Sequence, residues 1–330
     1  MYAVNTKNII HRLQELRDCG DTAYSDMLSI DQLSVQEIER IFAMARLFRE
    51  LKTEKLDFLK GVSVGLAFFE SSTRTKSSFD WAGKHLGADV VAAGSGTAEK
   101  KGESLFDILQ VIDAMNPKVL VVRTGFSGLP EQLARHTSAS VINAGDGTHE
   151  HPTQALLDGL TMIDELETLE GKVVTIVGDI SHSRVFGSLA RLLKKLGAIV
   201  RVAAPETLLL ENVEEVFGVK VFYDVEEALK NADVVYALRI QNERGATGDI
   251  STVREYSKAY GISAERFALA KKNAILMHPG PIQRDIDVHH ALVALPQSRI
   301  LQQVENGLAV RKTLLWLLGG REEEKEFVRV

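Results

Sequence analysis

Hydroxyl side chains and one arginine are concentrated in the stretch Ser71-Ser72-Thr73-Arg74-Thr75, directly after an apolar run from Val62 to Phe69. The run predicts a buried strand, and the residues that follow place Phe79, Ala82 and Leu86 on one face of a helix. The first amides of a helix lack intrahelical partners and lie at the positive end of its dipole. Hydroxyl groups and a guanidinium add further donors, so this strand, turn and helix start would suit a phosphate.

The same stretch, read alone, is also compatible with an ordinary Ser/Thr helix cap beside a solvated arginine. The Gly-x4-Gly-Lys-Ser/Thr spacing of a nucleotide-binding loop is missing from it, so a nucleoside triphosphate is not indicated. Support for an anion site must therefore come from other residues.

Polar residues also follow the ends of other predicted strands. Arg123 comes directly after Val119–Val122, and the segment Gly145–Gln154 follows a strand at 139–143. In that segment His151 and Gln154 lie three residues apart on a helix start, where both side chains can face one point. His149 and His151 could suggest a metal, but the nearby carboxylates are not at a recognised ligand spacing and no cysteine cluster exists, so no metal is expected.

The second half of the chain repeats this arrangement with different side chains. Gly178-Asp179-Ile180-Ser181-His182-Ser183-Arg184 ends a strand and starts a helix without the Gly-x-Gly-x-x-Gly of a dinucleotide site. The planar guanidinium of Arg184 is suited to a carboxylate instead. Arg239 and Gln241 follow another strand, and Met277-His278-Pro279-Gly280-Pro281 forms a rigid turn whose carbonyls are free to accept hydrogen bonds.

Apolar runs alternating with helical patterns predict an α/β fold with two doubly wound parallel sheets. Predicted strands lie at 62–69, 89–93, 118–123, 139–143, 172–178, 199–203, 220–223, 234–238 and 274–277. Ser34 and Glu37 form a capping box for one helix, a helix near 153–167 joins the domains, and a helix at 307–318 packs back on the first domain. We expect one domain from 1–150 with 305–330 and another from 151–304, with residues 1–30 as a partly ordered lead-in.

Four arginines (Arg74, Arg123, Arg184 and Arg239) close four predicted strands. In parallel sheets, ligands bind beyond the carboxyl ends of the strands, so these residues should face one region. Their charges would repel unless anions neutralised them. The first domain's set suits phosphate and the second's suits carboxylates, which predicts a two-substrate anionic site in a cleft between domains.

Composition narrows the class of protein. At 330 residues, about two domains are expected. The net charge of −6 comes without a long basic block, which argues against nucleic acid, and no apolar run approaches the ~18 residues of a membrane span. The N-terminus lacks the apolar core of a secretory signal, and the only cysteine, Cys19, fits a reducing cytoplasm.

From about residue 30 to 318 the chain resembles the aspartate/ornithine carbamoyltransferase family. The stretch from Phe68 to Asp80 is similar to that family's carbamoyl phosphate signature, and Gly145–Gln154 to its second signature. Arg184, Arg239–Arg244 and Met277–Pro281 resemble the aspartate-specific members. The resemblance implies transfer of a carbamoyl group to L-aspartate, which gives N-carbamoyl-L-aspartate and phosphate in pyrimidine biosynthesis.

The resemblance also implies a role for each matching residue, with no cofactor and no side-chain nucleophile. The residues expected to hold the phosphate are Ser72, Thr73, Arg74 and Thr75. Those expected to polarise the carbamoyl carbonyl are Arg123, His151 and Thr75. Those expected to bind the carbamoyl NH2 are Gln154 and the backbone carbonyls of Gly280 and Pro281. Those expected to hold aspartate are Lys101, Arg184, Arg239 and Gln241.

Further expectations concern assembly and closure. Lys101, on a loop at 94–103, would reach into a neighbouring subunit's site, so complete sites would need a homotrimer. Glu70 would pair with Arg184 and Arg244 on domain closure. Regulatory or dihydroorotase chains are conceivable partners. Two positions depart from the family pattern, since Lys76 stands where Arg is usual and Asp80 where Glu is usual.

Two other interpretations stay open at this point. The chain could be a carbamoyltransferase for another amino acid, which the set Arg184, Arg239 and Gln241 argues against. It could also be a catalytically silent paralogue that keeps the fold as an assembly partner, although the predicted phosphate and carbonyl residues are all present. The absent glycine fingerprint disfavours a dehydrogenase.

Overall fold

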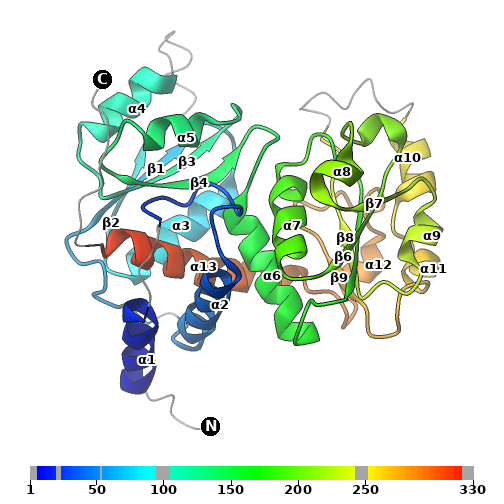
Figure 1. Cartoon of the computed structure of the whole chain (residues 1–330), viewed down its shortest axis with the longest axis horizontal. Helices are drawn as coiled ribbons and strands as arrows, with labels where there is room; N and C mark the ends of the chain where they lie inside the picture. The colour runs from blue at the N-terminus through cyan, green and yellow to red at the C-terminus, as the bar shows by residue number, and fades with distance from the viewer. Residues whose placement is uncertain (1–5, 20–23, 53, 94–104, 242–251, 322–330) are drawn as a thin grey trace. The chain divides into compact units, whose positions relative to one another are not determined.

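The computed structural model describes residues 6–19, 24–52, 54–93, 105–241 and 252–321. The chain divides into two compact units, unit 1 with Met1–Leu156 and Glu305–Val330, and unit 2 with Leu157–Val304. Their boundaries fall within α6 (Pro152–Leu166) and α13 (Ile300–Gly319). Each unit has a parallel sheet covered by helices, as Figure 1 shows, which confirms the predicted α/β class.

The described strands of unit 1 form a four-stranded sheet in the order β2-β1-β3-β4. They are β1 (Ser63–Phe68), β2 (Asp89–Ala93), β3 (Val119–Thr124) and β4 (Ser140–Asp146), and all neighbours pair in parallel. The chain runs outward from β1 to β2 and then returns to β3 on the other side of β1. The carboxyl ends of β1 and β3 therefore flank the switch point where such sheets bind ligands.

Helices cover both faces of this sheet. On one face, α4 (Leu105–Asp113) and α5 (Leu129–Ala134) share a core with alternate residues of β1, β3 and β4, including Leu120. Val119 points to the opposite face, where a Cβ on Gly319 of α13 would lie 3.2 Å from it. Arg311 of α13 donates to Ser78 Oγ of α3 (Thr73–His85) at 3.0 Å.

The C-terminal helix packs on unit 1, as predicted. Trp316 stacks on Phe58 with ring centroids 4.6 Å apart, and Arg49 of α2 (Val35–Glu50) donates to Asn306 Oδ1 at 2.6 Å. The helix begins at Ile300, seven residues before the predicted start. The prediction missed its first two turns because the apolar pattern on which it was based weakens before residue 307.

The N-terminal part of the chain corrects one expectation. Residues 1–30 were expected to be a partly ordered lead-in, but Thr6–Asp18 form helix α1, which buries Ile9 and Leu13. The next helix begins as predicted, because Ser34 and Glu37 form both hydrogen bonds of a capping box at the start of α2.

The described strands of unit 2 form a five-stranded parallel sheet in the order β7-β6-β5-β8-β9. They are β5 (Val173–Val177), β6 (Ile199–Ala203), β7 (Lys220–Phe222), β8 (Val234–Ala237) and β9 (Ile275–Met277). The chain moves from β5 to β7 in one direction and returns to β8 on the other side of β5. The switch point of this sheet therefore lies between β5 and β8.

Helices again lie on both faces. One core joins β5, β8 and β9 to α9 (Val225–Leu229), α11 (Ala264–Phe267) and α12 (His290–Val293). On the other side, Phe186 of α7 (Arg184–Lys195) contacts Phe217 of α8 (Val213–Phe217), with ring centroids 4.9 Å apart. The short 3-10 helix Glu206–Leu208 and α10 (Val253–Tyr260) complete the unit. Within the described ranges, no helix has the length and apolar character needed to cross a membrane.

Candidate functional site

The turn after β1 has the local structure that the sequence predicts. Ser72 occupies the N-cap position of α3, but its side chain makes no capping hydrogen bond, so the ordinary Ser/Thr cap is not what forms here. Thr73 and Arg74 are exposed in the first turn, whereas Thr75 is buried. The exposed first turn thus presents a hydroxyl and a guanidinium at the positive end of the helix dipole, which is an arrangement suited to an anion.

Arg123 lies on the adjacent strand, beside this turn. Phe68, the last residue of β1, is in register with Arg123 of β3. The Arg123 Nη1 donates to Ala144 O at 3.3 Å, and its Nε lies 3.6 Å from Glu70 Oε2. Glu70 therefore has Arg123 as a partner inside unit 1, which the sequence did not suggest. Its expected partner Arg244, and Lys101, lie outside the described residues.

His151 and Gln154 follow β4, so they lie beyond the same carboxyl edge of the sheet as the residues after β1 and at the end of β3. Both side chains are buried, and His151 directly precedes Pro152, the first residue of α6. The turn before them requires glycine, because Gly147 has φ +49° and a Cβ there would lie 2.3 Å from Ser127 Oγ. The phosphate and carbonyl residues predicted in unit 1 thus lie at or beyond the carboxyl ends of β1, β3 and β4, three neighbouring strands.

Two buried acids that the sequence analysis did not single out shape this loop. Asp146 accepts hydrogen bonds from the amides of Gly128 and Glu150 at 2.8 and 3.1 Å. Glu150 accepts from Ser29 Oγ at 2.6 Å and from the Ile30 amide at 3.1 Å. Their role is structural, since they tie the loop to α5 and to the N-terminal segment. Only their position inside the motif could have drawn attention to them.

His149 and Glu131 face Asp146 from the solvent side. His149 Nδ1 lies 3.0 Å from Asp146 Oδ2, and this hydrogen bond raises the pKa of the imidazole. Burial raises the pKa of the Glu131 carboxyl. The three groups are close enough to share a cation, but Asp146 already accepts four hydrogen bonds, which accounts for its position.

In unit 2, a buried carboxylate joins the loops after β5 and β8. Asp179 Oδ1 accepts from the His182 amide at 3.1 Å and lies 2.9 Å from His182 Nδ1, while its Oδ2 accepts from the Gln241 amide at 3.0 Å. The loops can approach because residue 178 is glycine, where a Cβ would lie 2.4 Å from Leu238 O. Asp179 thereby connects the predicted aspartate-binding residues on either side of the switch point.

The two predicted carboxylate-binding arginines belong to these loops. Arg184 is the first residue of α7, which Ser183 caps by accepting from the Phe186 amide at 3.3 Å, and the Arg184 side chain is buried. Arg239 follows β8 by two residues and is half-buried. The third predicted element, the turn at 278–281, follows β9, so the residues predicted in unit 2 also share one sheet edge.

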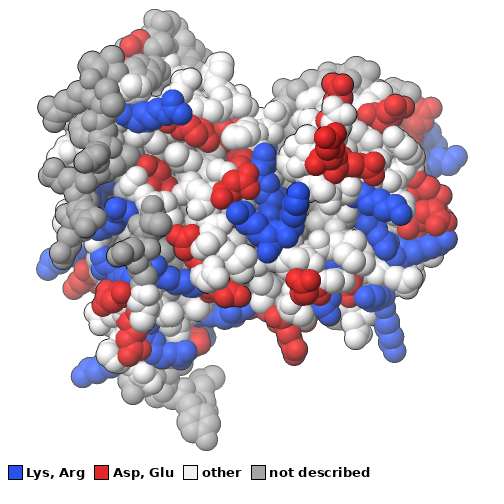
Figure 2. Space-filling view, in the orientation of Figure 1, with Lys and Arg blue, Asp and Glu red and all other residues white. Residues whose placement is uncertain are grey.

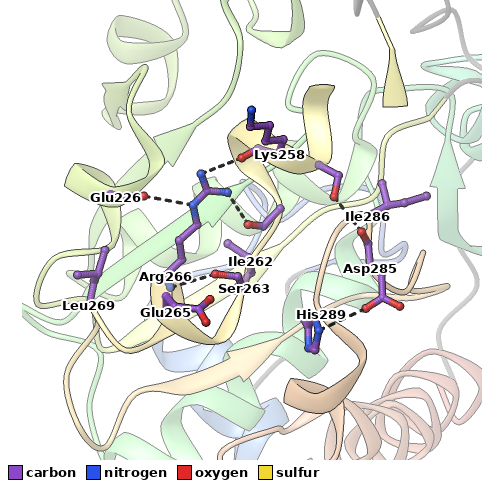
Figure 3. A pocket seen from close by; sticks show the side chains of 12 residues that line it. Glu226, Lys258, Ile262, Ser263, Glu265, Arg266, Leu269, Asp285, Ile286 and His289 are labelled. Carbon is purple, nitrogen blue, oxygen red and sulfur yellow. Dashed lines mark hydrogen bonds and ion pairs between the residues drawn. The ribbon is translucent and has the colours of Figure 1, made fainter. Parts of the chain in front are cut away.

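A pocket of about 490 Å³ lies elsewhere in unit 2 (Figure 3). It is lined by none of the predicted site residues. Its wall includes Arg266, whose guanidinium donates to the carbonyls of Gly261 and Lys258 at 2.9 and 3.0 Å and lies 3.6 Å from Glu226 Oε1. These contacts bridge α10, α9 and α11, so Arg266 acts here as a structural tie.

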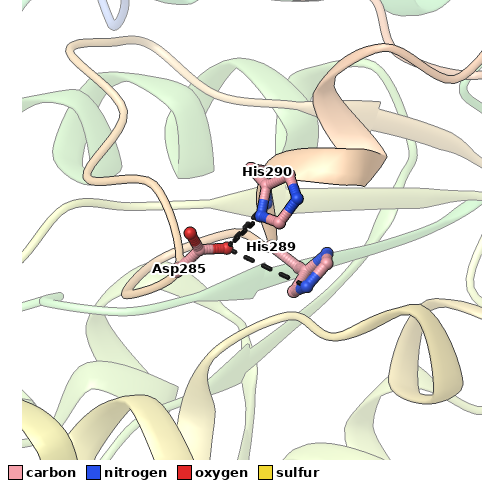
Figure 4. A group of neighbouring side chains, drawn as sticks. All are labelled: Asp285, His289 and His290. Atoms are coloured by element: carbon pink, nitrogen blue, oxygen red, sulfur yellow. Dashed lines mark hydrogen bonds and ion pairs between the residues drawn. The ribbon is translucent and has the colours of Figure 1, made fainter.

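Asp285, His289 and His290 form an exposed cluster at the start of α12 (Figure 4). Asp285 Oδ1 accepts from the His290 amide at 2.9 Å and lies 2.8 Å from His290 Nδ1, and these hydrogen bonds hold the pKa of the carboxyl below its usual range. His289 Nδ1 accepts from the Ala291 amide at 3.3 Å, which leaves the proton on Nε2. That nitrogen lies 4.0 Å from Asp285 Oδ1, and the hydrogen bonds that both histidines and Asp285 make at the helix start account for the cluster.

Charge on the visible surface is mixed. Among the coloured residues of Figure 2, Lys and Arg are interspersed with Asp and Glu. With a net charge of −6, positive potential for an anion must come from local groups such as those at the two strand edges.

Comparisons with known proteins place the chain in a family. Residues 25–164 match the family description "Aspartate/ornithine carbamoyltransferase, carbamoyl-P binding domain", and residues 170–318 match "Aspartate/ornithine carbamoyltransferase, Asp/Orn binding domain". The chain belongs to the aspartate/ornithine carbamoyltransferase family.

Particular relatives are similar over most of their length. The aspartate carbamoyltransferase catalytic subunit of Natranaerobius thermophilus is 46% identical over 301 residues, 90% of this chain and 96% of that one. The corresponding subunit of Syntrophotalea carbinolica is 45% identical over 304 residues, 91% and 97% of the two chains. Aspartate transcarbamoylase from Trypanosoma cruzi, solved with carbamoyl phosphate and aspartate, is 31% identical with a TM-score of 0.79 over 89% and 96% of the chains.

Proposed function

We propose that this chain is the catalytic chain of an aspartate carbamoyltransferase, transferring the carbamoyl group of carbamoyl phosphate to the amine of L-aspartate. The relatives that are 43–46% identical over about 90% of the chain carry this activity in their names. The observation that supports the proposal is the position of the candidate residues, since Arg74 and Arg123 lie at or beyond the carboxyl ends of β1 and β3 in unit 1, and Arg184 and Arg239 follow β5 and β8 in unit 2.

We propose that residues 1–150 with 305–330 form the domain that binds carbamoyl phosphate. Ser72, Thr73, Arg74 and Thr75 bind the phosphate through the start of α3 and its hydroxyl groups. Arg123, His151 and Thr75 donate hydrogen bonds to the carbamoyl oxygen, on which negative charge grows as the tetrahedral transition state forms. Gln154 accepts from the carbamoyl NH2, as do the carbonyls of Gly280 and Pro281.

The residues 151–304 then bind L-aspartate. Arg184, Arg239 and Gln241 hold its two carboxylates, together with Lys101, and leave the neutral amine to attack the carbamoyl carbon. A C–N bond forms, the C–O bond to phosphate breaks, and the departing phosphate takes a proton from the amine. The protein supplies positioning and charge stabilisation and needs no side-chain nucleophile.

The guanidinium pair of unit 2 favours aspartate over an amino acid with a cationic side chain, because ornithine would bring an ammonium group toward Arg184 and Arg239. The test is product formation from carbamoyl phosphate with L-aspartate and, separately, with L-ornithine. Formation of carbamoyl aspartate alone is expected. Turnover with ornithine alone would refute the assignment of unit 2, and no turnover with either substrate by a folded protein would refute the proposed activity.

We further propose that the protein is a homotrimer with shared active sites, acting in the cytoplasm in pyrimidine biosynthesis. This proposal extends the resemblance, which implies that Lys101 reaches into the site of a neighbouring subunit. Mixing inactive Lys101→Ala and His151→Ala chains should restore activity, since some mixed sites would then contain both residues. If mixed trimers form and stay inactive, the shared site is wrong.

A further inference from the structure

A chain of buried polar side chains in unit 2 ends at the turn that carries Gly280 and Pro281. Its members come from β8, α6, α13, the turn directly after β9 and the segment before α12. They are at most 3% exposed: Tyr236, Asp158, Gln303, His278 and Asp287. Burying so many polar groups is costly unless they satisfy one another, so their arrangement needs an explanation.

The network begins on α6. Asp158 accepts from Tyr236 OH at 2.6 Å and from Gln303 Nε2 at 2.7 Å, one donor to each carboxylate oxygen. Because its NH2 is committed to Asp158, Gln303 presents its amide oxygen to the backbone N–H of His278, which donates to it at 3.1 Å. The orientation of Gln303 is therefore fixed by Asp158, and it anchors the residue that opens the turn.

The His278 ring is held from its other side. Its Nδ1 accepts from the Gly280 amide at 2.8 Å, so the proton of a neutral ring lies on Nε2. Nε2 lies 3.2 Å from Asp287 Oδ2, which also accepts from the Gln283 amide at 2.8 Å. One carboxylate thus selects the tautomer of His278 and fixes the backbone on both sides of Gly280 and Pro281.

We infer that Asp287 and His278, anchored by Gln303 and Asp158, are positioning residues for the carbamoyl amide. This inference rests on the proposed function, in which the carbonyls of Gly280 and Pro281 accept from the carbamoyl NH2. A carbonyl is directional as an acceptor, so a turn that can rotate loses contact with the NH2 without any loss of charge. The network acts on the substrate through the turn and touches none of its atoms.

The test compares two ligands that share a phosphate. Carbamoyl phosphate has the NH2 that the turn binds, whereas inorganic phosphate lacks it. In calorimetric titrations, the Kd of Asp287→Ala for carbamoyl phosphate should be about ten-fold higher than that of wild type. This increase corresponds to the loss of roughly one or two hydrogen bonds. Binding of inorganic phosphate should change less than about two-fold.

Two further variants control for chemistry and location. Asp287→Asn keeps a carbonyl oxygen for His278 and Gln283, so it should stay within about three-fold of wild type. Asp285→Ala removes an exposed carboxylate two residues away and should leave the ratio of the two affinities unchanged. In steady-state kinetics, the KM for carbamoyl phosphate should rank the variants in the same way, with the largest increase for Asp287→Ala and the smallest for Asp285→Ala.

Equal weakening of both ligands by Asp287→Ala, or a wild-type ratio in the folded variant, would overturn the inference. If Asp287→Ala does not fold, Gln303→Met decides by the same ratio, since it removes the acceptor for His278 N–H and keeps the Asp287 contact. Failure of wild-type protein to bind carbamoyl phosphate at all would instead refute the proposed function.

Discussion

Asp179 offers a sharp test of how unit 2 is built, because one buried carboxylate joins the loops that carry Arg184 and Gln241. Replacing Asp179 with alanine removes the acceptor for the amides of His182 and Gln241. A buried amide left without an acceptor costs about 1–3 kcal/mol. Water can enter the enlarged space and accept some of the lost hydrogen bonds. We therefore expect a cost in the lower half of the range for each amide, about 3 kcal/mol for the two amides together.

This cost reduces the affinity for aspartate, because part of the binding free energy is then used to order the two loops. About 2.8 kcal/mol corresponds to a hundred-fold change in an equilibrium constant, so the KM for aspartate should rise by up to about a hundred-fold in Asp179→Ala. Asp179→Asn keeps one carbonyl oxygen but points an NH2 at one of the two amides. One lost hydrogen bond should raise this KM about ten-fold.

The assay is steady-state kinetics with each substrate varied, together with thermal unfolding of each variant. The KM for carbamoyl phosphate should change little, because the residues proposed to bind its phosphate belong to unit 1. Asp224→Ala is the matched control, as Asp224 also accepts from two backbone amides but does so at the exposed start of α9. A folded Asp179→Ala enzyme with the wild-type KM for aspartate, or with no larger change than the control, would refute this reasoning.

Three other changes test separate parts of the structure. Burial lowers the pKa of Lys312 to about 8 from 10.5, so the folded state binds fewer protons than the unfolded state between these values and stability should rise with pH across that window. Lys312→Met should accordingly be more stable by about 2 kcal/mol at pH 7, because the lost hydrogen bond to Lys52 O offsets about 1.4 kcal/mol of a limit of ~3.4 kcal/mol. In urea titrations this gain should shrink as the pH rises and vanish at about pH 9.5, where the remaining cost of burying the charge equals that hydrogen bond. The raised pKa of His149 adds stability that is complete below about pH 6.5 and lost as pH rises through the folded value, so His149→Gln should lower stability at pH 6 but not at pH 9. The loss should stay below about 1 kcal/mol because the ring is 39% exposed, and equal losses at both pH values would contradict it. Arg74→Lys should raise the KM for carbamoyl phosphate at least about ten-fold, since an ammonium cannot make a bidentate contact, and an unchanged KM would remove Arg74 from the phosphate site.

The strands were predictable because buried parallel strands are short apolar runs with distinct ends. Each of the nine predicted strands has a counterpart whose bounds differ by three residues or fewer, as at 139–143, where β4 runs from Ser140 to Asp146. The start of α2 was predictable for another reason, since a capping box is local and its two side chains contact only neighbouring backbone.

Helix α1 could not be recognised in the same way. It buries only Ile9 and Leu13 among thirteen residues, so its apolar stripe is narrower than that of an ordinary surface helix. Their spacing of four residues was the available signal, and a polar composition concealed it. The helix contacts α2, so tertiary packing contributes to its stability.

The buried acids of the candidate site were beyond sequence reasoning for a geometric reason. Asp158 and Gln303 are 145 residues apart, and Asp179 and Gln241 are 62 apart. Nothing in either local pattern distinguishes such an acid from a solvated one. The arginines could be predicted because they stand at the ends of recognisable strands. The acids could not, because their hydrogen-bond partners are distant in the sequence and come close only in the folded chain.

These acids suggest that one group of residues fixes the geometry of the loops and another group attracts the charged substrate. Asp146, Asp179 and Asp287 each accept hydrogen bonds from backbone amides inside the protein, where salt has little access. Arg74 is exposed, so its attraction for phosphate should weaken as salt screens it. Raising the salt from about 0.05 to about 0.5 M should therefore shrink the effect of Arg74→Lys on the KM for carbamoyl phosphate, while the KM ratio of Asp179→Asn to wild type for aspartate stays constant. A ratio for Asp179→Asn that falls with salt would mean that this acid acts through its charge on the ligand rather than through the loops it joins.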